Sequence, residues 1–313
     1  MYTEKARTIM EEVKKVVVGK DDCVEKVMMA ILASGHILIE DIPGVGKTTM
    51  ALAFSKACEL QQNRVQFTPD VLPADITGFS IYQKERGTFS YQSGAVMCNL
   101  FLADEINRTS PKTQSALLEV MEEGNVTVDG KTREVPRPFL VIATQNPIGS
   151  AGTQMLPESQ LDRFMICMSM GYPDMENEIA IMKERHTGNP IDRVVPVVHA
   201  GELLLMQRET ERIFIHDVLY NYIAKLIEAT RNHDYLELGL SPRGTIAVSK
   251  MARAAAYLDG REYAVPADVE AVFKDVSIHR IKLNAKARVS HVSAQEILEG
   301  ILESVPKPTP KRK

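Results

Sequence analysis

The sequence predicts an α/β fold, with a central parallel sheet flanked by helices, followed by a smaller all-helical domain. Three observations lead to this expectation. Short apolar runs of strand length alternate with amphipathic helical segments in the first half of the 313-residue chain, as in a parallel α/β layer fold. A glycine-rich loop joins the first of these runs directly to a helix. Beyond about residue 174, only helical periodicity of any strength remains.

The composition is that of an ordinary globular chain, with 44% hydrophobic and 25% charged residues. A net charge of −4 argues against a domain that coats nucleic acid, because such domains are usually basic. The four cysteines form no CxxC pair, which argues against a zinc site or a disulfide framework. No apolar run reaches the length of a membrane span, and the N-terminus lacks a signal-peptide core. We therefore expect a cytoplasmic protein.

The first elements are expected to be two helices, a strand and a third helix. Apolar side chains recur at helical spacing from Thr3 to Val18, where Gly19 ends the pattern. Either Asp21 or Asp22 can cap the second helix, which runs to about residue 32. The run 36–40 is short and apolar, as a buried parallel strand is, and residues 49–59 form the next helix.

Two more apolar runs, at 99–103 and 139–144, have the same character and predict two further strands. Between them lies a helix with recognisable ends. Ser110 is a good N-cap, Pro111 suits the first helical position, and Gly124 ends the helix.

Two insertions interrupt this pattern. Residues 75–96 contain turn residues and alternating apolar positions, which are typical of a small inserted β structure. Residues 125–135 contain Asp129-Gly130, a strong type I′ hairpin signal. Each insertion either serves a partner or substrate, or is a surface hairpin without such a role.

The rest of the chain predicts a second domain built from helices. The boundary falls between about residues 171 and 193, which divides the chain into 1–190 and 191–313. The last residues, KPTPKRK, predict a disordered basic tail. Helical periodicity covers residues 176–186, 200–212, 217–232, 241–258 and 267–283.

The sharpest motif is DIPGVGKT at residues 41–48, placed between the first strand and its helix. That context predicts a phosphate-binding P-loop, in which backbone N–H groups and the helix N-terminus hold the β-phosphate. Lys47 adds a positive charge toward the β- and γ-phosphates, and Thr48 offers a hydroxyl to Mg²⁺. The usual pattern begins with glycine, and this chain has Asp41 there. The expected nucleotide-binding residues are Pro43, Gly44, Val45, Gly46, Lys47, Thr48 and Thr49.

A second motif is an apolar strand that ends in two acids, Asp104 and Glu105. In α/β folds the carboxyl edge of the sheet is where ligands bind. We expect Asp104 to hold the Mg²⁺ shell, and Glu105 to orient and deprotonate the attacking water. The alternative is an acidic strand end that caps the following turn.

These motifs, together with FLADEINRTSPKTQSALLEVMEEGNVTVDG, ATQNP, LPESQLDRF and GLSPRG, closely resemble the MoxR group of AAA+ ATPases from about Val17 to at least Val276. The resemblance implies a P-loop AAA+ core with a helical lid. It assigns Asn146 as sensor 1, Arg163 as the arginine finger for a neighbouring subunit, and Arg243 as sensor 2 for the γ-phosphate of its own subunit.

The resemblance further implies that Val18 and Gly19 contact the adenine. Relatives often have glutamine next, where this chain has Lys20. Residues 75–96 match the helix-2 insert and residues 125–135 the pre-sensor hairpin, both of which face the ring pore in related ATPases. Rings of this kind are commonly hexameric, and MoxR proteins act as chaperone-like motors that mature or assemble other proteins, including metalloenzymes. Their partners often carry von Willebrand factor A domains.

The expected function is therefore Mg²⁺-dependent ATP hydrolysis by such a motor. An alternative is an ATP-gated binding scaffold in which turnover is incidental, and another is a nucleic-acid motor. A GTPase is disfavoured because no NKxD motif occurs. Individual residues have plainer alternatives: Arg163 as a surface charge, Asn146 as a turn former, and Arg243 as an exposed first-turn residue. Arg108 is a rival for the phosphate contact.

Overall fold

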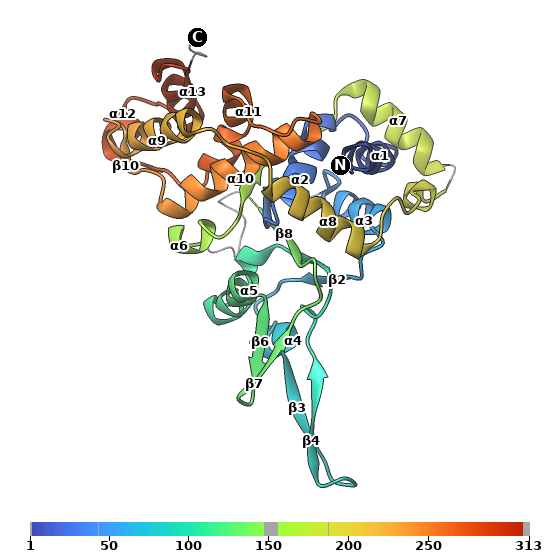
Figure 1. The fold of residues 1–313 in the computed structure, drawn as a ribbon. Helices are drawn as coiled ribbons and strands as arrows, with labels where there is room; N and C mark the ends of the chain where they lie inside the picture. Colours follow the sequence, from blue (N-terminus) through green and yellow to red (C-terminus); the bar gives the residue numbers. More distant parts are fainter. Residues whose placement is uncertain (1, 43, 147–155, 187, 309–313) are drawn as a thin grey trace.

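The structure is a computed structural model that describes residues 2–42, 44–146, 156–186 and 188–308. At its centre lies a five-stranded sheet with the strand order β2-β5-β8-β1-β9 (Figure 1). All neighbouring pairs in this sheet are parallel, as expected from the alternation of strands and helices. The strands are β1 (Ile37–Glu40), β2 (Gln62–Gln66), β5 (Leu100–Asp104), β8 (Leu140–Gln145) and β9 (Ile166–Met168).

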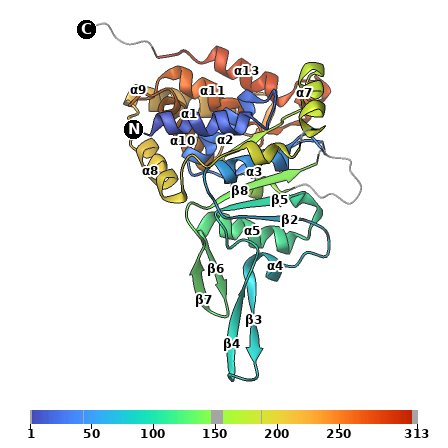
Figure 2. The ribbon, with the colours of Figure 1, turned by 90° about the vertical axis from the view of Figure 1, so that its right-hand side faces the viewer.

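Helices cover both faces of this sheet, so its central strands are buried on two sides (Figure 2). In β1, Ile37 and Ile39 belong to one core, whereas Leu38 between them belongs to the other. This division follows from the alternation of side chains along a strand. The first core includes side chains of α1 (Thr3–Lys14), α2 (Asp21–Leu32) and α3 (Lys47–Ala57), and the second those of α5 (Pro111–Glu123).

The expected ends of α5 are confirmed. Ser110 Oγ accepts a hydrogen bond from the backbone N–H of Thr113, Pro111 is the first helical residue, and Gly124 ends the helix with a φ of 65°. The first helix is shorter than expected, because α1 ends at Lys14 and not at Val18.

Each of the two insertions forms a β-hairpin, and both project from the same end of the core (Figures 1 and 2). The first consists of α4 (Pro73–Thr77), β3 (Gly78–Gln83) and β4 (Thr88–Ser93). The second consists of β6 (Asn125–Val128) and β7 (Lys131–Glu134), with Asp129 and Gly130 at positive φ as a type I′ turn requires. The guanidinium of Arg133 lies 3.9 Å from the ring centroid of Tyr91 and joins the two hairpins.

Among the described residues of the C-terminal part, β structure is limited to an isolated bridge between Phe214 and Tyr263 and a short ribbon. In the ribbon, β10 (Leu236–Leu238) pairs antiparallel with β11 (Lys282–Leu283). The helix expected over 267–283 ends at Ser277, and the sequence did not predict α12 or α13. None of the helices in the described ranges has the length and hydropathy needed to cross a bilayer. The remaining helical elements are α6 (Glu158–Leu161), α7 (Met175–His186), α8 (Ala200–Glu211), α9 (Asp217–Arg231), α10 (Pro242–Leu258), α11 (Pro266–Ser277), α12 (Ala285–Val289) and α13 (Ala294–Ser304), with 3-10 turns at Ile106–Arg108 and Pro190–Arg193.

Arg280 joins this helical part to the α/β part. Its side chain is 2% exposed, and Nε pairs with Oδ1 of Asp162 over 2.8 Å. The same guanidinium donates to the carbonyl oxygens of Asp162, Phe164 and Met165 in the segment that leads into β9. Because each of these acceptors lies in one short segment, this buried cation binds the two parts to each other. It does so beside other contacts, such as the ion pair of Lys26 with Asp275 and a shared apolar core.

Candidate nucleotide-binding site

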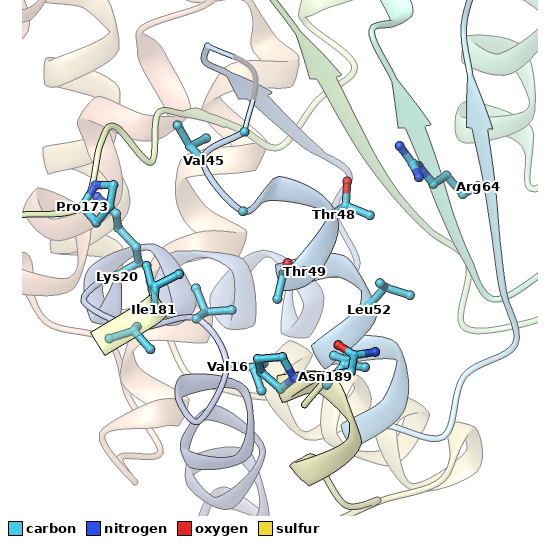
Figure 3. Close-up of a pocket in the computed structure, with 16 residues that line it drawn as sticks. Val16, Lys20, Val45, Thr48, Thr49, Leu52, Arg64, Pro173, Ile181 and Asn189 are labelled. Atoms are coloured by element: carbon cyan, nitrogen blue, oxygen red, sulfur yellow. The ribbon is translucent and has the colours of Figure 1, made fainter. Parts of the chain in front are cut away.

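The P-loop borders a cavity of about 420 Å³ at the junction of β1 and α3 (Figure 3). Of the predicted nucleotide-binding residues, Val18, Gly44, Val45, Gly46, Thr48 and Thr49 line it. Gly19 is not a lining residue, although its neighbours Val18 and Lys20 are. Pro43 lies outside the described residues. The sequence motif thus forms a wall of a real cavity.

Gly46 allows the loop to turn directly into α3. It is the N-cap of that helix and has a φ of 98°, a left-handed conformation that favours glycine. The first turn of α3 therefore begins at Lys47 and Thr48 and presents its free backbone N–H groups at the cavity. A helix N-terminus of this kind attracts anions.

The side chain of Lys47 is buried beside the cavity and does not line it. Nζ donates to the main-chain oxygen of Asp41 over 2.8 Å. Burial lowers the pKa of the Lys47 ammonium, while the carboxylates of Asp41, Asp104 and Glu105 oppose that shift. The lysine therefore lies among three acidic residues, which favour its charged form.

Asp41, which replaces the usual glycine, binds the chain that follows β9. Its Oδ2 accepts hydrogen bonds from the backbone N–H of Met170 (2.6 Å) and of Gly171 (2.7 Å), and from Ser169 Oγ (3.1 Å). Its Oδ1 accepts from the backbone N–H of Ile42 over 2.8 Å. The carboxylate thus connects the P-loop to residues 169–171.

The two acids at the end of β5 are positioned by Thr144 on the neighbouring strand β8. Thr144 Oγ1 donates to Asp104 Oδ1 (3.2 Å) and accepts from the backbone N–H of Glu105 (2.9 Å). Arg64 on β2 donates from Nε to Asp104 Oδ2 over 2.6 Å. Because Arg64 also lines the cavity, this ion pair connects Asp104 to the cavity wall.

Glu105 has a left-handed backbone with a φ of 55°, a conformation that costs energy for a residue with a side chain. Its carboxylate accepts from Arg108 Nη1 over 2.8 Å. This hydrogen bond from Arg108, and to a smaller extent one from the Asn146 amide, lowers the pKa of the Glu105 carboxyl. Glu105 is therefore ionised at neutral pH, as a general base must be.

Asn146 follows β8 at the same edge of the sheet and is buried. Its main-chain oxygen accepts from Asn107 Nδ2 over 3.3 Å. The side-chain oxygens of Asn146 and Asn107 have no partner among the described residues. Buried polar atoms normally have a partner, so these two amides leave hydrogen-bonding capacity for a polar ligand beside Glu105.

Arg163 and Arg243 do not line this cavity, and neither do Asp104, Glu105 and Asn146. Both arginines instead pair with Glu122 on α5. Arg163 Nη1 also donates to the main-chain oxygen of Leu118 over 3.0 Å. The two arginines predicted to act on a γ-phosphate therefore lie next to each other, at a second place on the protomer.

The end of the cavity opposite Thr48 and Arg64 is formed by segments that are far apart in the sequence and that no sequence motif connects. Val16, Val18, Ile181 and Pro190 line it, and Figure 3 shows Lys20 and Pro173 on the side opposite Thr48 and Arg64. Lys20 Nζ donates to the main-chain oxygen of Tyr172 over 2.8 Å. Lys20 is thus held by the chain that precedes α7.

Comparison with known proteins agrees with this geometry. Residues 36–166 match the family described as "ATPase family associated with various cellular activities (AAA)", and residues 228–301 match the AAA lid domain. Fold and site together define an AAA+ ATPase, with a P-loop after β1, paired acids at the end of β5 and a helical lid.

Individual relatives show to which family of AAA+ ATPases the chain belongs. Chaperone MoxR1 of Mycobacterium tuberculosis is 39% identical over 95% of this chain and 81% of its own length. YeaC of Bacillus subtilis is 44% identical over 96% of this chain and 93% of its own length. A crystal structure from Cytophaga hutchinsonii, provisionally described as an ATPase, superposes with a TM-score of 0.92 at 38% identity over 98% of this chain and 96% of that one. The chain belongs to the MoxR family of AAA+ ATPases.

Proposed function

We propose that this chain binds ATP with Mg²⁺ in the cavity beside the P-loop and hydrolyses it, as one subunit of a chaperone-like ring. One observation carries the proposal. The P-loop, the Asp104–Glu105 pair and Asn146 lie at the ends of β1, β5 and β8, three adjacent strands, at one edge of the sheet. The relative named Chaperone MoxR1 supports the chaperone part of the proposal.

In this proposal the two ends of the cavity hold the two ends of ATP. The backbone N–H groups of Gly44, Val45 and Gly46 and the Lys47 ammonium hold the phosphates. The apolar side chains of Val16, Val18 and Ile181 at the other end provide a surface on which an adenine can stack.

Thr48 and Asp104 are the residues that would hold Mg²⁺. The Thr48 hydroxyl lines the cavity and makes no side-chain hydrogen bond within the described residues, so its oxygen is available. The Asp104 carboxylate is buried, and Thr144 fixes its orientation. Hydroxyl and carboxylate oxygens are suitable Mg²⁺ ligands. When bound, the ion would neutralise negative charge that develops on the phosphates during hydrolysis.

Glu105 is the proposed general base, and Asn146 the residue that orients the attacking water. Glu105 is ionised, and the Asn146 amide lies close enough to lower its pKa. A carboxylate next to an amide with an unused oxygen offers two hydrogen-bonding groups for one water molecule. Removal of a proton by a positioned carboxylate is the usual way to activate such a water.

We propose that Arg163 and Arg243 both act on the nucleotide of a neighbouring subunit. Because they share Glu122, a surface that presents one of them also presents the other. This placement favours a role in trans for Arg243, in place of the role within its own subunit expected from the sequence. Two guanidinium groups beside a γ-phosphate would stabilise the transition state. The active site is then complete only in an oligomer, for which we propose a hexameric ring.

The β3–β4 hairpin is the proposed contact for client proteins. Its apolar side chains are unusually open to solvent: Phe89 is 73% exposed, Tyr82 51% and Phe79 46%. Exposed apolar side chains gathered in one place mark interaction sites. We propose that the chain acts in the cytoplasm on proteins and not on nucleic acid, with a partner that carries a von Willebrand factor A domain.

The test is the ATPase rate per subunit as a function of protein concentration, with Mg²⁺-ATP in excess. A rate that rises and then saturates is expected, because each site needs a neighbour. Lys47→Ala, which removes the P-loop cation, should abolish turnover at every concentration. A substantial rate that does not depend on concentration would contradict the shared site. Nucleotide-dependent client capture without turnover would favour the scaffold alternative.

A further inference from the structure

Glu122 is the one residue of the described chain to which both Arg163 and Arg243 are bound. Arg163 Nη1 donates to Oε2 and Arg243 Nη2 donates to Oε1, so each carboxylate oxygen takes one guanidinium. The three side chains are between 30% and 43% exposed. They therefore lie at the surface, where a neighbouring protomer could reach them.

The positive charges of Arg163 and Arg243 explain why the two side chains need the Glu122 carboxylate between them. Two guanidinium groups held by one carboxylate lie within a few ångströms of each other, and like charges at that distance repel. A shared anion offsets the repulsion, and hydrogen bonds between ionised groups are strong and directional. Without Glu122, the two arginine side chains would separate.

The position of Glu122 on α5 also favours the binding of cations. It lies in the last turn of the helix, and that turn contains no basic residue. Carboxylates are unfavourable at that end because the helix dipole is negative there, whereas cations are favourable. Arg163 also donates to Leu118 O on the same helix. The end of α5 is thus a site for cations, and two arginines from other segments occupy it.

A second contact fixes the same two segments. Asp162, next to Arg163, accepts a hydrogen bond from Ser241 Oγ over 2.9 Å. Ser241 is the N-cap of α10, the helix that carries Arg243 in its first turn. The backbones of both arginines are therefore anchored together, and Glu122 sets the direction of their side chains.

We infer that Glu122 is a positioning residue that aligns Arg163 and Arg243 as a pair for delivery to the nucleotide of a neighbouring subunit. The inference rests on the proposed role of both arginines in trans. It adds that the active site of one protomer depends on a carboxylate of the next, which itself touches neither substrate nor metal.

The test compares Glu122→Gln with Glu123→Gln, a change of the adjacent exposed glutamate, for which no ion pair occurs within the described residues. Glu122→Gln keeps the size of the side chain and removes its charge. We expect kcat to fall about 10- to 100-fold, the loss typical of a misplaced catalytic group, with the ATP affinity unchanged. Glu123→Gln should keep the wild-type rate.

Mixing two variants identifies where the effect acts. Lys47→Ala protomers cannot hydrolyse ATP but keep Glu122 and both arginines. Added to Glu122→Gln protomers, which keep an intact P-loop, they should restore turnover at the Glu122→Gln sites that they adjoin. A wild-type rate for Glu122→Gln alone would overturn the inference, and so would a lost rate that mixing does not restore.

Arg163→Ala, measured in parallel, separates this inference from the proposed function. If Arg163→Ala retains full turnover, the arrangement in trans is wrong and the role of Glu122 is wrong with it. If Arg163→Ala loses turnover while Glu122→Gln does not, only the role of Glu122 is wrong.

Discussion

Arg64, on the edge strand β2, donates from Nε to Oδ2 of Asp104 across 2.6 Å. Asp104 is 6% exposed, whereas the Arg64 side chain is half exposed. The carboxylate thus has one cation that can move away toward solvent. In the proposed function, Mg²⁺ binds at Asp104 and can take over this neutralising role.

Arg64→Ala should destabilise the nucleotide-free protein by about 1–2 kcal/mol, because a buried carboxylate loses its charged partner. Mg²⁺ with ADP should recover much of that loss, since a second cation then lies beside Asp104. Urea unfolding of wild type and variant, with and without Mg²⁺-ADP, measures both effects. An equal loss under both conditions would show that Arg64 and Mg²⁺ do not substitute for each other.

Glu105→Gln should bind ATP as the wild type does and lose turnover by about 10² to 10⁴-fold, because the amide cannot accept the proton of the attacking water. Binding is measured with a fluorescent ATP analogue and turnover by phosphate release. Glu119→Gln, an exposed position on α5, is the matched control and should retain both. Undiminished turnover in Glu105→Gln would remove Glu105 from the mechanism.

Asp41→Gly would create the usual first residue of a P-loop, yet we expect it to weaken the protein. The substitution leaves the backbone N–H groups of Met170 and Gly171 without their acceptor. Buried donors without partners cost about 1–3 kcal/mol each, so the free energy of unfolding should fall by about 2–4 kcal/mol.

The control for Asp41 is Ser169→Ala, which removes one of the hydrogen bonds to the carboxylate and keeps the two backbone donors paired. It should cost about 1 kcal/mol. Denaturant titration of both variants checks the order. If Asp41→Gly is as stable as wild type, the carboxylate does not hold the segment after β9.

His36 should make the protein less stable as the pH falls below neutrality. Nε2 donates to Met121 O over 3.0 Å, and Nδ1 accepts from the backbone N–H of Val141 over 3.1 Å, so the ring is neutral. Burial lowers the pKa of His36 to about 4, against about 6.5 in an unfolded chain. Between these values the unfolded state binds more protons, so stability falls as the pH decreases.

His36→Gln should make this dependence shallower between about pH 6.5 and 4, although the variant is less stable overall. Denaturant unfolding at several pH values measures the slope. His279 is also buried with a pKa well below its usual value, so some dependence should remain in the variant. A slope identical to that of wild type would show that His36 does not carry the effect.

The sequence was sufficient to predict the middle of the sheet and failed at its edges. β1, β5 and β8 are buried on both faces and appear as short apolar runs. The outer strand β2 is partly exposed and reads QNRVQ, without an apolar run. The other outer strand, β9, has only three residues. β2 lacks the apolar surface by which patterns of hydrophobicity detect strands. β9 is apolar and buried, but three residues are too few to form a recognisable pattern.

The candidate site divides in a similar way. The place of Gly46 and Thr48 at the cavity could be predicted, because both belong to one contiguous motif whose local spacing defines the loop. Arg64 could not, because its partner Asp104 lies on another strand and its own segment has no motif. The sequence also could not predict that Arg163 and Arg243 share Glu122 as a partner. The three residues belong to separate segments, which come together only in the folded chain.

The buried guanidinium of Arg280 has a consequence for how the subunit can change shape. Separating the lid from the segment 162–165 would leave that cation with only the main-chain oxygen of Val276 in the lid, at a cost of several kcal/mol. Lid and core of one chain should therefore turn as a single rigid body. In the proposed ring, any movement driven by nucleotide would then occur at the boundaries between protomers and not within one subunit.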